Sequence, residues 1–448
     1  MLEFINKYIL GATVPCALMA TGIYFWIRLK LFPITKLPQV AKSLTRNGKS
    51  SLRALALSLA GTLGVGNIAG VATALCLGGA GAMLWMWISA AVAAVLKYAE
   101  IVLAMLYREP SPTGYRGGAP YYIRATVSLR APFFGRLLAA LFALLCIVNC
   151  ISMGAVIQTG AVSEALDGAL NIPPVICGVA LALLTFRLMR GGAERTTRLT
   201  SALVPFMSVF YVVLSLAVII PRAHRLPQLF RSIFADAFSI ESATGGFLGF
   251  LLSRSLRFGV MRGLFSNEAG CGTSPTAHIG SGSTPCEQGF MGIVEVLVDT
   301  ILLCSMTGFS LLLVDAPISA DAPIGSVLSA FSSAFPPRWA VLIEAAMALM
   351  IFCFGFATVS CMSHYALECV GFLSKRGLAG RLFIPTYSFF VFLGAVAGGS
   401  GGWAVSDATV GIMTLINLAV LVLSRREIVA ETEKHFKKPK KQTAERKN

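Results

Sequence analysis

The stretch "GTLGVGNIAG", residues 61–70, interrupts a run that otherwise has the composition of a membrane-spanning helix. It places four glycines and Asn67 within ten residues. Each glycine in a helix interior costs about 1 kcal/mol relative to alanine. Either close helix packing compensates for this loss, or the backbone is built to open here.

The composition assigns the chain to the membrane proteins. Of its 448 residues, 56% are hydrophobic and 13% are charged, whereas soluble domains average about 25% charged residues. The net charge of +16 is carried by certain loops and the tail. This distribution is typical of a membrane-topology signal and does not require a nucleic-acid partner. Eleven scattered cysteines and four histidines show no ligand spacing. We therefore expect no disulfide, no cofactor and no metal beyond a coupling ion.

Long apolar runs predict eleven membrane spans. They cover about residues 6–31, 53–77, 80–107, 136–164, 173–189, 199–220, 243–280, 288–314, 338–370, 382–398 and 403–424. Every second connection is rich in lysine and arginine, which the positive-inside rule assigns to the cytoplasm. This predicts an N-terminus outside and a C-terminus inside. One outer connection carries Arg222, Arg225 and Arg231, and we expect a short interfacial helix there.

A second interruption, "SNEAGCG" at residues 266–272, lies five spans after the first. The same span carries Arg254, Arg257 and Arg262, which are too costly in lipid, so this span must face protein or water. An odd number of spans per half inverts the second half relative to the first. Paired broken helices in inverted halves are typical of a secondary transporter with its substrate site at the midplane. Small-residue helix packing is the alternative explanation.

Several motifs resemble the alanine/glycine:cation symporter (sodium:alanine symporter) family. They are "GVGNIAGVATALCLGGAGAMLWMW", "KYAEIVLAMLYR", "GGAPYYI", "RGLFSNEAGCGTSPTAH" and "DTILLCSMTG". The resemblance implies an all-α bacterial or archaeal membrane protein with a leucine-transporter-type five-plus-five inverted repeat and one extra N-terminal helix. The single transporter domain then divides into an extra span and basic loop (1–50), a first repeat (51–220), a second repeat (243–424) and a basic cytoplasmic tail (425–448).

The resemblance also implies the site residues. The substrate-binding candidates are Gly64, Gly66, Asn67, Gln158, Ser266, Asn267, Gly270, Gly272 and Met362. Thr358 and Ser360 in "FATVSCMS" are the Na⁺ candidates, because hydroxyls and freed carbonyls suit a hard cation. Taken alone, Thr358 would bond back to its own helix, and Gln158 would equally well bond a neighbouring helix.

Four of the charged residues within the predicted spans are candidates for a coupling or structural role. Lys97 and Glu100 are three residues apart on one helix, which favours an internal ion pair or network over a proton relay. Glu268 lies inside the second break, where it would either sense protonation or hold the helix ends together. Asp299 opens the family-like motif "DTILLCSMTG". All four are candidate coupling or structural charges.

These features predict a Na⁺-coupled importer of small neutral amino acids, alanine first and then glycine or D-alanine, in the bacterial plasma (inner) membrane. Its partners are the amino acid, Na⁺ and the lipid bilayer; the sequence indicates no oligomeric state. A proton-coupled symporter using Glu268 or His364 is the alternative. A membrane enzyme is disfavoured because metal and nucleophile motifs are missing from the sequence; a channel is a further rival.

The chain departs from the family at one substrate-binding candidate. The family places a tryptophan where this chain has Met362, and the flexible methionine side chain would make that wall of the pocket more deformable.

Overall fold

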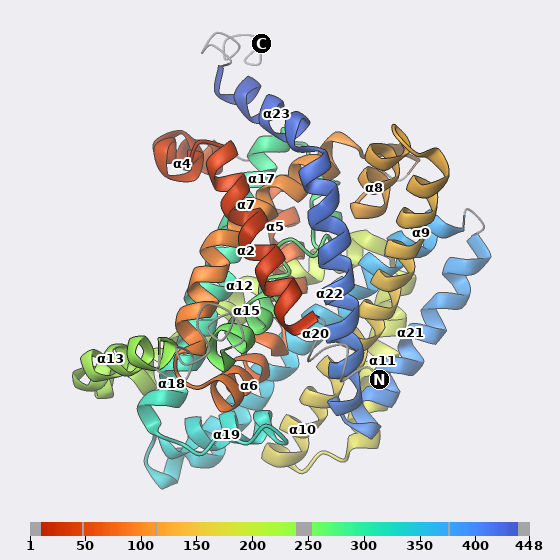
Figure 1. Cartoon of the computed structure of the whole chain (residues 1–448). Helices are drawn as coiled ribbons and strands as arrows, with labels where there is room; N and C mark the ends of the chain where they lie inside the picture. The colour runs from red at the N-terminus through yellow and green to blue at the C-terminus, as the bar shows by residue number, and fades with distance from the viewer. Residues whose placement is uncertain (1–9, 47–48, 113, 239–252, 375–376, 438–448) are drawn as a thin grey trace, which may run out of the picture.

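The computed structural model describes residues 10–46, 49–112, 114–238, 253–374 and 377–437, almost all of them helical (Figure 1). The first half contains α2 (Gly11–Arg28), α3 (Phe32–Thr35), α4 (Leu37–Arg46), α5 (Lys49–Thr62), η2 (Val65–Asn67), α6 (Ala69–Gly78), α7 (Ala82–Leu106), β1 (Glu109–Ser111), β2 (Gly114–Arg116), α8 (Ala119–Ser128), α9 (Pro132–Asn149), η3 (Cys150–Ile157), α10 (Gln158–Leu170), α11 (Pro174–Arg190), α12 (Gly192–Ile219), η4 (Ile220–Arg225) and α13 (Leu226–Ala237). The second half contains α15 (Arg254–Asn267), α16 (Pro275–His278), α17 (Pro285–Val296), η6 (Leu297–Cys304), α18 (Ser305–Val314), α19 (Pro323–Ser333), η7 (Pro337–Trp339), α20 (Ala340–Leu373), α21 (Gly377–Ala397), α22 (Ser400–Leu423) and α23 (Arg425–Lys437).

Seven helices in the described ranges are long and apolar enough to cross a membrane, and the bent pair α5 and α6 makes an eighth. The other three predicted spans correspond to α2, α11 and α15, with 18, 17 and 14 residues. The count of eleven and the repeat symmetry stay predictions. Residues 243–252 of the predicted seventh span lie outside the described residues. A short helix, α13, follows the sixth predicted span, and its expected position at the membrane interface stays a prediction.

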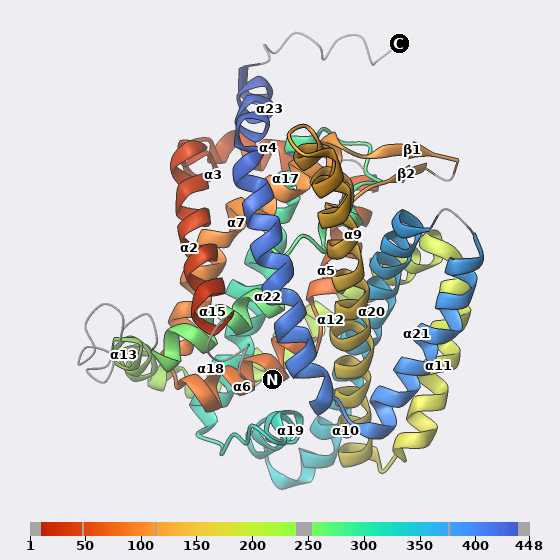
Figure 2. The same cartoon turned by 45° about the vertical axis from the view of Figure 1, so that its right-hand side comes forward.

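The two ends of the helical bundle differ in composition. Helices α4, α8 and α23 and the β1–β2 hairpin lie at one end, and α13 and α19 lie at the other (Figure 2). We call the first the basic end, because the arginine-rich and lysine-rich segments predicted to be cytoplasmic gather there. The extra N-terminal helix α2 packs along α7, α15 and α22, and is therefore integral to the bundle.

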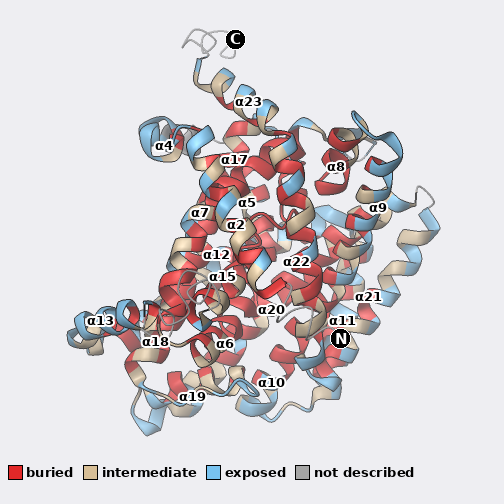
Figure 3. Cartoon of the chain, viewed as in Figure 1, coloured by how far each residue is buried: buried red, intermediate tan, exposed pale blue. Residues whose placement is uncertain are grey.

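The interior of the bundle holds buried apolar and polar side chains, and the outer surface is largely apolar. The outward faces of α9, α11, α12 and α21 expose large apolar side chains such as Phe133, Leu183, Val209 and Phe389, which suits contact with lipid. The central helices α5, α7, α15 and α20 are mostly buried (Figure 3). Two of the long helices contain π-helical turns, η3 and η6, and such turns often occur at functional sites.

Candidate functional site

The first interruption is a real break in the helix. Helix α5 ends at Thr62, a short 3₁₀ turn follows, and α6 continues at an angle of 60°. The freed N–H of Val65 donates to Gln158 Oε1 at 2.9 Å, and Thr358 Oγ1 donates to the carbonyl of Ala60 at 2.9 Å. Side chains from α10 and α20 thus satisfy the backbone groups that the break releases, as buried backbone requires.

Gly64 lies where these side chains converge. A Cβ atom at Gly64 would lie 2.6 Å from Thr358 Oγ1 and 2.9 Å from Gln158 Oε1. No larger residue fits unless one of these side chains moves. The glycine therefore lets polar groups from two other helices approach the main chain.

Replacing Gly64 with alanine is expected to reduce the alanine uptake that the sequence predicts by at least about tenfold. The added methyl group overpacks the break by about 1–3 kcal/mol and displaces Gln158 or Thr358. Gly70→Ala is the matched control, because a Cβ at Gly70 would meet no heavy atom within 4 Å. Uptake into proteoliposomes measures both variants, and equal rates would show that Gly64 lies outside the transport site.

The second interruption follows α15, which ends at Asn267. Glu268 adopts a left-handed backbone with φ of 52°, and Gly270 and Gly272 have φ of 87° and 84°. Glycine adopts such dihedrals at little cost. The Asn267 side chain caps the break, because its Oδ1 accepts from the N–H of Ala269 at 2.9 Å. The chain resumes as the short helix α16.

The two breaks meet at one carboxylate. Asn67 Nδ2 of the first break donates to Asp299 Oδ1 at 2.7 Å, and Ser266 Oγ beside the second break donates to Asp299 Oδ2 at 2.7 Å. Thr300 Oγ1 donates to the same Oδ2 at 2.8 Å. A Cβ at Gly66 would lie 3.2 Å from the Phe265 ring, so the two broken segments are in contact. Asp299 lies on the π-helical turn η6 and is fully buried.

Asn67 has an oxygen without a hydrogen bond. Its Oδ1 is buried and finds no partner among the residues that the structure describes. Buried amide oxygens are normally satisfied. If the side-chain amide of Asn67 flipped, exchanging the positions of Oδ1 and Nδ2, Oδ1 would face Asp299 in place of Nδ2. The cluster would then present oxygens from Asn67, Ser266, Asp299 and Thr300, the ligand type that hard cations prefer.

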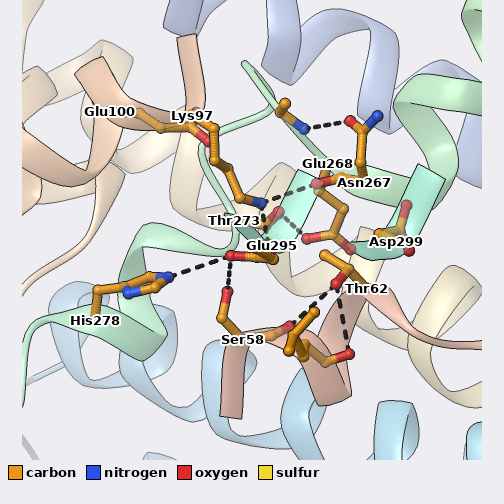
Figure 4. Close-up of polar contacts among 12 residues, drawn as sticks. Ser58, Thr62, Lys97, Glu100, Asn267, Glu268, Thr273, His278, Glu295 and Asp299 are labelled. Carbon is orange, nitrogen blue, oxygen red and sulfur yellow. Dashed lines mark hydrogen bonds and ion pairs between the residues drawn. The ribbon is translucent and has the colours of Figure 1, made fainter. Parts of the chain in front are cut away.

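A second buried carboxylate, Glu295 on α17, contacts side chains from three other elements (Figure 4). It pairs with Lys97 Nζ at 2.9 Å, accepts from Ser58 Oγ at 2.7 Å and lies 3.3 Å from His278 Nε2. These partners come from α7, α5 and α16. Lys97 Nζ also donates to the freed carbonyl of Asn267 at 2.9 Å. The internal network expected around Lys97 is present, with Glu295 and not Glu100 as the ion-pair partner.

Glu100 also forms a hydrogen bond to the main chain of the second break. Its Oε2 accepts from the N–H of Gly272 at 3.1 Å and from Asn417 Nδ2 at 2.9 Å. Within the break, Thr273 Oγ1 donates to Glu268 Oε2. The other carboxylate oxygens of Glu100 and Glu268 are buried and lack a hydrogen-bond partner in the described part of the chain. Glu268 is buried, and Figure 4 shows it among the polar side chains of the two breaks.

A cavity of about 430 Å³ leads to the first break from the end opposite the basic one. It is lined by α6, α10 and α19 and reaches Val65. At its side, Arg262 forms an ion pair with Asp407, with both guanidinium nitrogens at 3.2 Å from the carboxylate. The guanidinium stacks on Trp403 at 4.7 Å from the ring centroid, and Trp403 in turn contacts Phe265. Aromatic rings therefore separate this cavity from the second break.

Two predicted site residues make no hydrogen bond to either break among the described residues. Met362 packs against η3, close to Gly154 and with its Sδ 4.0 Å from Cys150 Sγ. Ser360 Oγ donates to Phe356 O of its own helix at 2.6 Å. The structure brings Gly64, Asn67, Gln158 and Thr358 to one break and Ser266, Asn267, Gly270 and Gly272 to the other. It joins the breaks through Asp299.

Sequence reasoning missed three side chains of this region. Phe265 precedes the second break, and Trp403 and Asp407 lie near the start of α22. The signal was available in part: Arg262 in an apolar span demands an acidic partner, and Asp407 is an isolated acid in the last span. Their pairing depends on how two distant helices face each other.

The fold and the site define a class. The structure aligns with a crystal structure of MhsT in complex with L-phenylalanine at a TM-score of 0.58 and 12% identity, covering 86% of this chain and 92% of that one. The chain is thus a helical membrane protein with a leucine-transporter-type fold.

The chain belongs to the sodium:alanine symporter family, whose family model matches residues 1–448. It is 33% identical to an uncharacterized transporter of Haemophilus influenzae over 98% of this chain and 96% of that protein. It is 31% identical to the sodium/alanine symporter AgcS of Methanococcus maripaludis, over 97% of this chain and 96% of that protein. Membership of this family assigns the chain to cation-coupled amino-acid symport in the cell membrane.

Proposed function

We propose that this protein imports small neutral amino acids, alanine and then glycine or D-alanine, together with Na⁺. The observation that carries this proposal is the Asp299 carboxylate shared by the two broken helices. One anionic oxygen cluster in contact with freed main-chain groups suits a cation and a zwitterion together. The name of the Methanococcus relative agrees with alanine as substrate.

The substrate is proposed to lie against the first break. Its carboxylate would meet N–H groups near Gly64, with Asn67 and Gln158 beside it. Gln158 Oε1 now accepts from the N–H of Val65, so it must turn aside when a carboxylate enters. The ammonium would meet carbonyls of the second break. Phe265, packed against Gly66, limits the space left for a side chain.

Asp299 is proposed to be the main ligand of the coupling Na⁺, joined by oxygens of Asn67, Ser266 and Thr300. Thr358 with the carbonyl of Ala60 is proposed as a second ion position. Ser360 would join it only after its hydroxyl leaves its own helix. Binding of Na⁺ would hold the two breaks together and so favour substrate binding.

The cavity that reaches Val65 opens at the end opposite the basic one. Because basic connections stay in the cytoplasm, we propose that this cavity faces the outside. The N-terminus is then outside and the C-terminus inside. In this arrangement the Glu295 network covers the breaks on the cytoplasmic side.

Proton coupling is the second candidate, and the buried, partly unsatisfied Glu268 inside the second break favours it. Uptake of labelled alanine and glycine into proteoliposomes distinguishes the two. Our proposal predicts accumulation that requires an inward Na⁺ gradient and that excess unlabelled alanine abolishes. Equal accumulation in Na⁺-free buffer under an imposed pH gradient would establish proton coupling instead. No saturable uptake under either condition would contradict both.

A further inference from the structure

A second cavity, of about 300 Å³, lies at the basic end of the bundle, far from the two breaks. It is formed where the end of α2 and the short helix α3 meet α23, and all three reach the basic end in Figure 2. Its lining consists of Arg28, Leu29, Lys30, Phe32, Thr35, Lys36, Val429, Thr432, Glu433, Phe436 and Lys437.

The charge of this cavity is unbalanced. Four cations line it against one carboxylate, Glu433. Lys30 and Lys437 share that carboxylate at 3.4 and 3.3 Å. Arg28 and Lys36 form no ion pair within the described residues; they lie over the rings of Tyr24 and Phe436. The cavity therefore has the chemistry to bind an anion with several oxygen acceptors, such as a phosphate group.

The position of the cavity favours a lipid as the source of that phosphate. The adjoining surface of α2 and α3 exposes Ile23, Ile27, Leu31 and Ile34, each at 49% or more. Such a surface is suited to contact with acyl chains, and three of the cations that line the cavity lie next to it in the sequence. A headgroup at this level would therefore have its phosphate at the cavity and its chains along α2.

We propose that this cavity binds the headgroup of an anionic phospholipid of the leaflet at the basic end. The sequence beyond α23 continues with Lys438, Lys440 and Lys441, which adds to the attraction for an anionic leaflet. The bound lipid would link α2 to α23 by bridging their cations. Such a site stands whether or not the proposed substrate is correct.

Native mass spectrometry of the purified full-length protein tests this site. The delipidated protein is titrated with phosphatidylglycerol, phosphatidylethanolamine or inorganic phosphate. We expect phosphatidylglycerol to be retained in preference to the other two. The variant Arg28→Gln/Lys36→Gln should bind it about 25-fold more weakly, at about fivefold per removed cation.

The matched control is Arg130→Gln/Arg195→Gln, which removes two exposed cations at the same end of the molecule. It should retain phosphatidylglycerol like the unaltered protein. Retention by Arg28→Gln/Lys36→Gln equal to that of the control would overturn the proposal. So would inorganic phosphate binding as tightly as the lipid. All four substituted side chains are exposed, so thermal midpoints should stay unchanged and confirm that the variants fold.

Discussion

Replacing Glu295 with glutamine is expected to lower the free energy of unfolding by about 3–5 kcal/mol. The substitution keeps the shape of the side chain but leaves the ammonium of Lys97 buried without its ion-pair partner. It also weakens the bonds from Ser58 and His278. Because these partners belong to α5, α7 and α16, the loss should loosen contacts among all of these helices. Thermal unfolding of the protein in detergent measures the change.

Two controls bracket this result. Glu194→Gln removes one member of an exposed pair with Arg198 and should change stability by less than about 0.5 kcal/mol. The double variant Lys97→Met/Glu295→Gln removes the stranded charge and should recover part of the loss. A thermal midpoint for Glu295→Gln equal to that of Glu194→Gln would contradict the role of Glu295 as the centre of this network.

Replacing Asp299 with asparagine is expected to weaken the apparent Na⁺ affinity of transport about 100-fold. Loss of a buried, hydrogen-bonded carboxylate from an ionic contact costs about 2–5 kcal/mol. Asparagine fills the same volume and still accepts from Ser266, so the breaks should stay in place. The Na⁺ dependence of alanine uptake measures the effect.

Asp315→Asn is the control for this substitution, because Asp315 lies just past α18, is exposed and pairs with Arg225. Its Na⁺ dependence should match that of the unaltered protein. If Asp299→Asn required no more Na⁺ than Asp315→Asn, the coupling ion would have to bind elsewhere, and Thr358 with the Ala60 carbonyl would be the next candidate.

The breaks were predictable because glycine destabilises a helix interior, so that several glycines close together in an apolar run indicate an interruption. Gly64 and Gly270 mark them directly, and the family resemblance placed Gln158 beside the first. The short helix α13 was expected because the arginines of the connection after the sixth span are too costly in lipid; its interfacial position stays a prediction.

The partners of the buried charges were not predictable from spacing. Lys97 and Glu100 are neighbours on one helix face, yet Lys97 pairs with Glu295 because α17 packs against α7. Asp299 and Glu295 are one turn apart, yet the π-helical turn η6 begins between them. Asp299 therefore bonds to the two breaks, whereas Glu295 pairs with Lys97. The contacts of Met362 and Ser360 depend on the rotation of α20, which a mostly apolar helix sequence with few polar residues does not fix.

The most direct test of the central claim is an experimental density map of the protein with saturating alanine and Na⁺. We expect alanine between residues 63–68 and 266–272, with an ion beside Asp299. Density for alanine remote from both breaks, or two continuous helices through these residues, would contradict it.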